Sequence, residues 1–355
     1  MTQSTSGLLL SGKALVSKRR VLPVAGEVRV KAGDRVTARE VIARAFSAGD
    51  RVTVPAAALL GVEPARLKHV VSVKPGDEVR EGQILARRTG LLGKQEIRSP
   101  ASGAIEKVSA STGLIFIRCR DRELSLHAYV DGTVVKVIEH LGAEIRCAAA
   151  MVQGVWGTGG EVVGPMVIAA DRPDEALGPD RVLAIHRGSV LVAGGRLLPQ
   201  TAIRAAEAEV SALISGSMRA ADFEAIETLG LTVILTEGFG DLPMCRKGFD
   251  ILVANAGRQA GASGITKVRA GAIRPEVIIP LGQSLSDPLP PSPARLDIGV
   301  LVRIVSGRRL GECGTVVDLP MEPRPIATGA IVPVAVVEME NGEKVLVPTS
   351  NVEGI

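Results

Sequence analysis

Two stretches decide the fold of the first half of the chain, Val73-Lys-Pro-Gly-Asp-Glu-Val-Arg-Glu-Gly-Gln-Ile-Leu85 and, shortly after it, Ile97-Arg-Ser-Pro-Ala-Ser-Gly-Ala-Ile105. The Gly-Asp and Gly-Gln steps favour tight turns, because glycine adopts backbone conformations that other residues avoid. Short alternating runs such as Ala104-Ile-Glu-Lys-Val108 are typical of strands with one buried face. We therefore expect short hairpins that pack into a small all-β module.

The same patterns occur a second time. The run Val30-Lys-Ala-Gly-Asp-Arg-Val36 is similar to Val73-Lys-Pro-Gly-Asp-Glu-Val79. Likewise, Ser99-Pro-Ala-Ser-Gly103 and the strand after it have a counterpart in Tyr129-Val-Asp-Gly132 and Thr133-Val-Val-Lys-Val137. This repetition predicts that one hairpin unit is used more than once.

Length and composition limit the class of protein. The chain has 355 residues, enough for two or three domains of about 100–200 residues each. Its residues are 46% hydrophobic but only 2% aromatic, so the core has to consist of Val, Ile, Leu and Ala side chains. The apolar run at residues 8–10 is too short for a signal sequence or a membrane span. We expect a cytoplasmic protein without a membrane span.

The spacing of cysteine and histidine argues against a metal or catalytic centre. The four cysteines lie at least 28 residues apart, which indicates reduced, mostly buried thiols and no zinc or redox motif. The histidines are scattered, and no local motif suggests a Ser-His-Asp triad. The sequence therefore predicts no catalytic residue and no metal site. The residues concerned are Cys119, Cys147, Cys245, Cys313, His69, His127, His140 and His186.

The net charge is positive only in the first half of the chain. Residues 1–170 hold 24 Lys and Arg against 16 Asp and Glu, residues 171–290 hold 12 against 14, and residues 291–355 hold 6 against 8. A nucleic-acid role would therefore need the basic first half.

From residue 171 the pattern changes to strands that alternate with helices. Apolar runs predict strands at residues 182–185, 189–192, 212–215 and 231–235, and helices are expected at residues 201–209, 220–229 and 249–257. Such alternation is typical of a small α/β domain with a mostly parallel sheet. Five prolines between residues 280 and 293 then predict a stiff linker.

Two turns of this α/β domain form the candidate ligand site. Both follow predicted strands, so they open at the carboxyl edge of the sheet, where open α/β sheets bind ligands. Backbone amides in these turns favour a small anion or a nucleotide, with Arg219 or Lys247 adding charge. Glycines that let a strand turn into a helix are the alternative explanation. The candidate residues are Ser215, Gly216, Ser217, Thr236, Glu237, Gly238 and Gly240.

The hairpins of residues 73–105 resemble those that frame the modified lysine of biotinyl and lipoyl carrier domains. The resemblance implies a barrel-sandwich hybrid fold. When the chain is aligned with the carrier pattern, Leu92 stands where the acceptor lysine belongs, and Lys94 is out of register. We therefore expect no attached biotin or lipoate and predict no cofactor.

A closer resemblance covers roughly residues 15–110. It is carried by Lys18-Arg-Arg-Val-Leu-Pro23, Val54-Pro55, Leu60-Gly61 and the later turn steps in the same order. These match the barrel-sandwich module of the C subunit of the Rnf electron-transport complex and of the A subunit of the sodium-pumping quinone reductase. The chain lacks the cysteine clusters and the Gly-rich flavin or nucleotide loop of members that move electrons. The resemblance therefore implies the fold and not the redox activity.

The C-terminal stretch, from Val300-Leu-Val-Arg-Ile-Val-Ser-Gly307 to Val345-Leu-Val-Pro348, resembles a KOW module. KOW modules are small SH3-like barrels of transcription elongation factors and ribosomal proteins, and a type I′ turn at Asn341-Gly342 fits the pattern. The resemblance implies nucleic-acid or ribosome contact. The stretch has no aromatic residue for base stacking, so we place protein–protein contact first. The candidate contacts to nucleic acid are Arg303, Arg308 and Arg309.

The sequence as a whole predicts a multi-domain β plus α/β protein. We expect a non-catalytic scaffold or adaptor with protein partners. A small-anion or nucleotide-binding sensor or enzyme is the first alternative, and a ribosome- or RNA-associated factor is the second. The expected divisions are a barrel-sandwich hybrid (biotinyl/lipoyl-like) at 1–110, an additional β module at 111–170, an α/β domain at 171–283, a Pro-rich linker at 284–296 and a KOW-like SH3-type barrel at 297–355.

Overall fold

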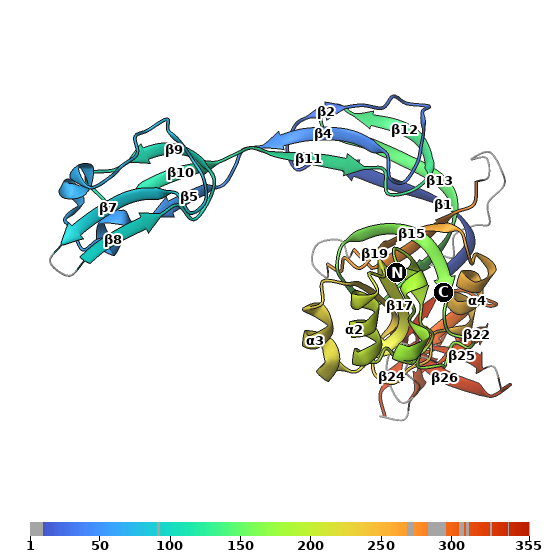
Figure 1. Ribbon diagram of the computed structural model, residues 1–355. Coiled ribbons are helices and arrows are strands. Elements are labelled where there is room, and N and C mark those ends of the chain that lie inside the picture. The colour runs from blue at the N-terminus through green and yellow to red at the C-terminus, as the bar shows by residue number, and fades with distance from the viewer. Residues whose placement is uncertain are drawn as a thin grey trace.

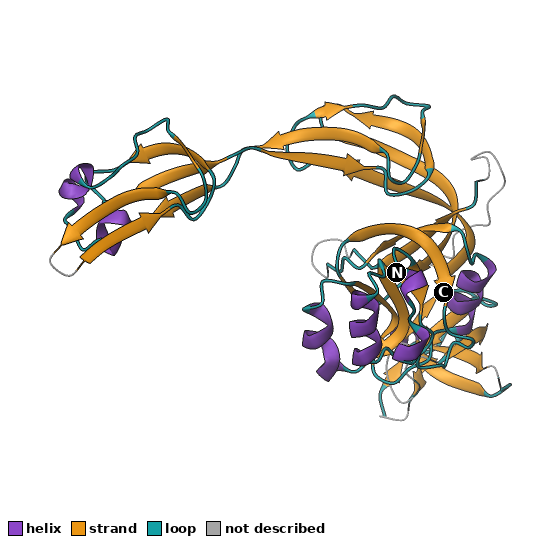
Figure 2. Cartoon of the chain, viewed as in Figure 1, coloured by secondary structure: helices purple, strands orange, loops and turns teal. Residues whose placement is uncertain are grey.

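The computed structural model describes residues 10–90, 93–267, 273–282, 296–304, 309, 312–326, 329–339 and 341–354. These residues form mostly β-structure, in several sheets of which none is closed, together with a few short helices (Figure 1, Figure 2). The expectation of a β-rich, multi-sheet fold is confirmed. The molecule is elongated, with one β module at its far end, a second in the middle and a larger part that contains all the longer helices (Figure 1).

The β module at the far end comprises residues 51–119 and is called the distal module here. A four-stranded sheet of order β5-β10-β9-β6 accompanies the two-stranded sheet β7-β8. Among the described residues, the core of the module is formed by its own side chains, which include Leu67, Leu85 and Ile117. Its elements are β5 (Arg51–Val54), α1 (Ala56–Leu59), η1 (Pro64–His69), β6 (Glu78–Val79), β7 (Ile84–Gly90), β8 (Gly93–Arg98), β9 (Gly103–Val108) and β10 (Ile115–Cys119).

The middle module, called the proximal module, is built from two separate parts of the chain. Strand β1 pairs with β13 and strand β4 pairs with β11, so residues before the distal module pair with residues after it. This pairing departs from the boundary expected at residue 110, because the N-terminal strands have their partners beyond that position. The elements are β1 (Leu10–Val21), β2 (Glu27–Val28), β3 (Arg35–Val36), β4 (Val41–Ser47), β11 (Arg122–His127), β12 (Gly132–Ile138) and β13 (Gly142–Gln153).

The two β modules contain the same turn, at the two copies of the repeated sequence. In each copy a lysine N–H donates to an aspartate side chain three residues later, from Lys31 to Asp34 at 2.7 Å and from Lys74 to Asp77 at 2.8 Å. The glycine before each aspartate has a positive φ, +95° in the first copy and +92° in the second, which other residues rarely adopt. The sheet order β1-β13-β12-β3 of the proximal module also corresponds to β5-β10-β9-β6 of the distal module. The sequence repeat is therefore a structural repeat.

One hairpin sets the relation between the two modules. In the proximal module Ser47 of β4 faces Arg122 of β11, and in the distal module Gly90 of β7 faces Gly93 of β8. Both hairpins carry a register irregularity at the end away from the apex. Positions 47 and 122 thus correspond to positions 90 and 93, the two sides of a hairpin apex. The distal module is inserted at the apex of the proximal hairpin.

The proximal module continues into the sheet of the α/β part. Strand pairing runs without interruption in the order β14-β18-β17-β16-β15-β19-β20-β13-β12-β3, and β15 to β18 pair in parallel. Helices α2 and α3 cover one face of this sheet and α4 covers the other. No helix in the described part of the chain is long and apolar enough to cross a membrane. The elements are β14 (Trp156–Thr158), β15 (Glu161–Ile168), β16 (Val190–Val192), α2 (Pro199–Glu207), β17 (Ala212–Met218), η4 (Ala220–Asp222), α3 (Phe223–Glu227), β18 (Thr232–Phe239), α4 (Arg246–Ala254), β19 (Gln259–Ser263) and β20 (Glu276–Pro280).

The strand expected at residues 182–185 is absent, and that prediction was wrong. The segment instead lies at two short turns of 3-10 helix, η2 (Pro179–Arg181) and η3 (Ala184–His186). Leu183 and Ile185 are 52% and 83% exposed, so two of the apolar side chains that suggested a buried strand face solvent.

The C-terminal residues form a five-stranded antiparallel sheet of order β26-β25-β22-β21-β27. A hairpin joins β25 and β26 as expected, and Gly342 in its turn has φ +80°. Position 340 of the turn lies outside the described residues, so the type I′ turn stays a prediction. Nearly all of the expected linker at 284–296 lies outside the described residues. The elements are β21 (Leu301–Ile304), β22 (Cys313–Asp318), β23 (Arg324–Pro325), β24 (Ile331–Val332), β25 (Val334–Met339), β26 (Lys344–Pro348), η5 (Thr349–Asn351) and β27 (Val352–Gly354).

The nested arrangement predicts that the distal module can be removed without unfolding the rest. Replacing residues 48–121 by Asn-Gly closes the proximal hairpin with a two-residue turn, the spacing found between Gly90 and Gly93. We expect the melting temperature of the remaining chain to change by less than about 4 °C, the equivalent of roughly 1 kcal/mol. Loss of cooperative melting, followed by circular dichroism, would show that the two modules depend on each other.

Candidate functional site

The C-terminal sheet presents a row of three side chains to the α/β part. Strand β21 lies between β22 and β27, and Arg303 of β21 faces Cys313 on one side and Glu353 on the other. Residues that face each other across neighbouring strands project from the same side of the sheet. Cys313, Arg303 and Glu353 therefore lie side by side.

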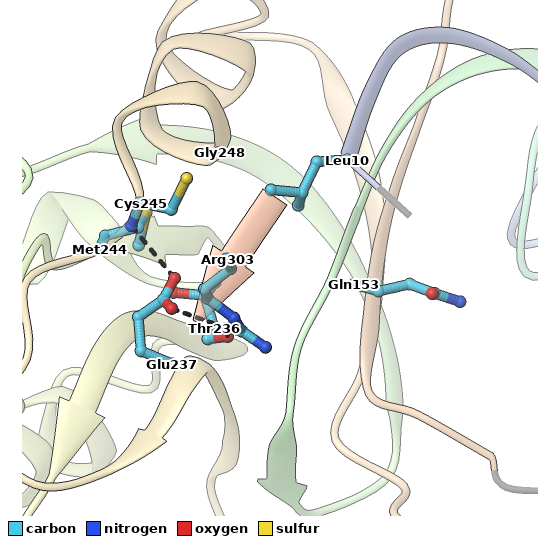
Figure 3. A pocket seen from close by; sticks show the side chains of 8 residues that line it. All are labelled: Leu10, Gln153, Thr236, Glu237, Met244, Cys245, Gly248 and Arg303. Atoms are coloured by element: carbon cyan, nitrogen blue, oxygen red, sulfur yellow. Dashed lines mark hydrogen bonds and ion pairs between the residues drawn. The ribbon is translucent and has the colours of Figure 1, made fainter. Parts of the chain in front are cut away.

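The α/β part places the carboxylate of Glu237 and the thiol of Cys245 near Arg303 of this row (Figure 3). Arg303 Nη1 donates to Glu237 Oε2 at 2.6 Å and to the carbonyl oxygen of Thr236 at 2.7 Å, and its Nη2 donates to Glu353 Oε2 at 2.8 Å. The backbone N–H of Cys245 donates to Glu237 Oε1 at 3.1 Å. We call these five residues the joint site: Glu237, Cys245, Arg303, Cys313 and Glu353.

The charged groups of the joint site are almost fully buried. The exposed fractions of the side chains are 2% for Glu237, 5% for Arg303 and 11% for Glu353. Burial lowers the pKa of Arg303, but attraction by and hydrogen bonds to Glu237 and Glu353 outweigh burial and raise it. Arg274 Nη2 lies 2.9 Å from Glu353 Oε1 and supplies a second cation. Each buried charge thus has a hydrogen-bonded partner of opposite sign, which is the condition for its burial.

The two thiols of the joint site are in contact. Cys313 Sγ donates a hydrogen bond to Cys245 Sγ, with 3.3 Å between the sulfur atoms. This hydrogen bond, together with the backbone N–H groups of Gly248 and Lys247 at the start of α4, lowers the pKa of Cys245 to about 7 although burial opposes the change. The same hydrogen bond and burial raise the pKa of Cys313 well above its ordinary value. Cys245 is therefore the thiol that ionises first.

An open groove of about 400 Å³ lies beside the thiols. Both cysteines line it, together with side chains that include Pro173, Pro243 and Met339. Around Glu237 and Arg303, in contrast, the described side chains pack too closely to admit a water molecule. Within the described residues there is no group of three or more His, Cys, Asp or Glu side chains that could hold a metal ion. The accessible chemistry of the joint site is thus that of its sulfur atoms.

The structure brings the residues of the expected anion site together but bonds most of their donors within the protein. These residues were expected in turns that follow two strands, but all except Gly240 lie within strands β17 and β18, so that placement was wrong. Their amide N–H groups and hydroxyl groups donate to backbone carbonyl oxygens of the α/β part. Gly238 lies next to a register irregularity between β17 and β18 and has φ +91°, a backbone conformation that favours glycine whether or not a ligand binds. Glu237 of this set is a member of the joint site. The bonded donors are the amides of Gly216, Ser217 and Gly240 and the hydroxyl groups of Ser215, Ser217 and Thr236.

The arginines considered for nucleic-acid contact have other partners. Arg303 is 4% exposed and lies inside the joint site, so it is not part of a surface patch. Arg309 pairs with Glu312 at 3.1 Å and with Glu343 at 2.6 Å. Arg308 lies outside the described residues.

No family model fits the chain, and no curated protein is significantly similar to it in sequence. The joint site has to be interpreted from its own geometry. Thr236, Glu237 and Arg303 were all predicted from the sequence as ligand contacts, and their joint network was not predicted. The sequence did hold one signal for a buried ion pair, because Arg303 is a charged residue inside the apolar run at residues 300–305.

Removal of the central cation is expected to destabilise the junction between the two sheets. Arg303→Met leaves the buried carboxylate of Glu237 and the Oε2 atom of Glu353 without their arginine partner. The free energy of unfolding should therefore fall by about 3–5 kcal/mol. Chemical denaturation measures the loss. Arg309→Met, at an exposed ion pair of the same sheet, is the matched control and should have a smaller effect. Equal effects of the two substitutions would contradict the role assigned to Arg303.

The reactivity of Cys245 should follow its lowered pKa. Because the thiolate is the nucleophile, the rate of alkylation of Cys245 by iodoacetamide should rise as the pH increases through about 7. Cys313→Ala should move this midpoint to higher pH, because it removes the largest cause of the lowered pKa. Cys147, whose pKa burial raises to about 11, should stay unreactive at neutral pH. A midpoint near the ordinary thiol value of 9.0 in the native chain is the opposing result.

Proposed function

We propose that the chain is a non-catalytic, multi-module scaffold or adaptor that presents the distal module at the end of an arm. The observation that carries this proposal is a module with its own core at the hairpin apex of a second, similar module. Arg51 and Arg118, at the two ends of the distal module, face each other across β5 and β10. The two ends of the distal module therefore fit the hairpin apex without a long linker. The rest of the module's surface stays available to protein partners. A cytoplasmic location is part of the same proposal.

Both β modules are then barrel-sandwich hybrids of the biotinyl and lipoyl type, and the C-terminal sheet is a KOW-like SH3-type barrel. In the proximal module the apex carries the distal module in place of an acceptor lysine. In the distal module Lys94 lies one step from the apex, opposite Thr89, and Leu92 lies outside the described residues. These positions support a docking role and argue against carrier chemistry. We therefore propose that neither biotin nor lipoate is attached.

Opposite charges at the two ends of the molecule support separate docking surfaces. Residues 50–119 hold eleven Lys and Arg against seven Asp and Glu, whereas residues 297–355 hold five against eight. Complementary charge steers association and selects partners more than it adds affinity. The distal module therefore suits an acidic protein surface.

The two alternatives have less support. A sensor or enzyme for small anions or nucleotides would need amide donors that are already bonded to carbonyl oxygens. Association with RNA or the ribosome through the C-terminal sheet would need Arg303, which is buried in an ion pair. Thermal shift with nucleotides, flavins and phosphorylated metabolites tests the first alternative, and salt-dependent retention on single-stranded RNA tests the second.

Affinity capture with matched variants tests the adaptor proposal. The full chain and the variant with Asn-Gly in place of residues 48–121 serve as baits in the same native lysate. We expect at least one protein to be retained by the full chain and lost, at least about tenfold, with the shortened variant, and its retention should weaken with added salt. Identical sets of bound proteins would remove the support for a docking arm. A ligand-induced rise in melting temperature that Arg219→Ala abolishes would favour the sensor.

A further inference from the structure

The joint site contains a pair of thiols that the scaffold role does not use. Cys245 lies immediately before α4 in the α/β part, and Cys313 is the first residue of β22 in the C-terminal sheet. The two residues are 68 positions apart in the sequence, yet their sulfur atoms lie 3.3 Å apart. A disulfide needs about 2.05 Å, so the sulfur atoms have to approach by only roughly 1.3 Å.

Solvent reaches the thiol pair from one side. The groove of about 400 Å³ that both cysteines line is large enough for part of a small organic molecule. Its other lining residues include Asp174, Arg246 and Asn341, which offer charge and hydrogen bonds to a polar reagent. A reagent in this groove reaches the sulfur atoms without unfolding of either sheet.

The surroundings favour a thiolate on one of the two sulfur atoms. Cys245 is the N-cap residue of α4, and the N–H groups of Gly248 and Lys247 stabilise negative charge on its sulfur. The Cys313 thiol donates to the same atom. The charge of Glu237 opposes a thiolate on Cys245, whereas the ammonium group of Lys247 attracts it. The arrangement provides a nucleophilic sulfur and, in contact with it, a second thiol.

We propose that Cys245 and Cys313 are a redox-active dithiol that exchanges with a low-molecular-weight disulfide entering the groove. The Cys245 thiolate attacks one sulfur of the disulfide, which forms a mixed disulfide and releases the other half as a thiolate. Cys313 then loses its proton and attacks Cys245 Sγ, which releases the second half as a thiolate. The protein loses two electrons and gains a Cys245–Cys313 disulfide, while the small disulfide is reduced to two thiols.

The disulfide would connect the two parts of the protein that the joint site holds together. It links the loop before α4 to β22 and closes a loop of 68 residues, which restricts the unfolded chain more than the folded one. Oxidation would therefore strengthen the attachment of the C-terminal sheet to the α/β part. The proposal depends on the thiol pair alone and holds whether or not the chain is an adaptor.

Equilibration with glutathione tests the proposal on the full chain. The reduced protein is incubated with glutathione buffers of increasing oxidised fraction, the remaining thiols are blocked with iodoacetamide, and the peptides are mapped by mass spectrometry. We expect a species that lacks two hydrogen atoms and contains a peptide linking Cys245 to Cys313. Its melting temperature should exceed that of the reduced chain by several degrees. Folded protein in which both thiols are still alkylated at the highest oxidised fraction would overturn the proposal.

Two variants separate the roles of the cysteines. Cys313→Ser removes the second thiol, so we expect a glutathione adduct to accumulate on Cys245. The double variant Cys119→Ser and Cys147→Ser keeps the pair and should form the same linked peptide as the native chain. If Cys313→Ser fails to fold, peptide mapping of the native chain still decides. A linked peptide that joins Cys245 or Cys313 to another cysteine, or forms only between two protein molecules, would also overturn the assignment.

Discussion

The arrangement of the first half of the chain depends on the register of strands β4 and β11. Ser47 and Arg122 face each other as the last residues before a hairpin apex would, although an entire module separates them in the sequence. The insertion fits because Arg51 and Arg118, at the ends of that module, are also neighbours. A hairpin whose ends are held by strand pairing tolerates an inserted domain, since the ends are already close together and loop closure adds little cost. The elongated shape of the molecule follows from this one constraint (Figure 1).

At the other end of the molecule, buried charge holds the C-terminal sheet on the α/β part. Arg303 binds carboxylates from both, Glu237 on one side and Glu353 on the other. Desolvation offsets much of the attraction within a buried ion pair, so the net gain in stability from forming one is small. We infer that the Arg303 network fixes how the two sheets meet. The same fixed contact holds Cys245 against Cys313, which makes a thiol pair out of two residues far apart in the sequence.

Much of the fold could be predicted from the sequence, because turns and alternation are local properties. The Gly-Asp turns near Asp34 and Asp77 form as the repeat indicated, and the expected helices of the α/β part are present. The nesting was missed, since strand pairing between residues before 50 and after 119 has no local signal. The prediction of a strand at residues 182–185 was wrong, because an apolar run alone does not show whether a neighbouring strand is there to pair with it. Glu237 and Arg303 were noticed separately, and their pairing depends on how two sheets pack. The contact of Cys245 with Cys313 has the same origin and left no sequence motif.

The most direct test of the nested arrangement is the ¹⁵N–¹H correlation spectrum of residues 50–120 expressed alone, compared with that of the full chain. An independent module predicts well-dispersed signals from β9 and β10 at the same positions in both spectra, because, among the described residues, every side chain of their core belongs to the module. Signals that collapse to the narrow range of an unfolded chain in the isolated fragment would contradict the account.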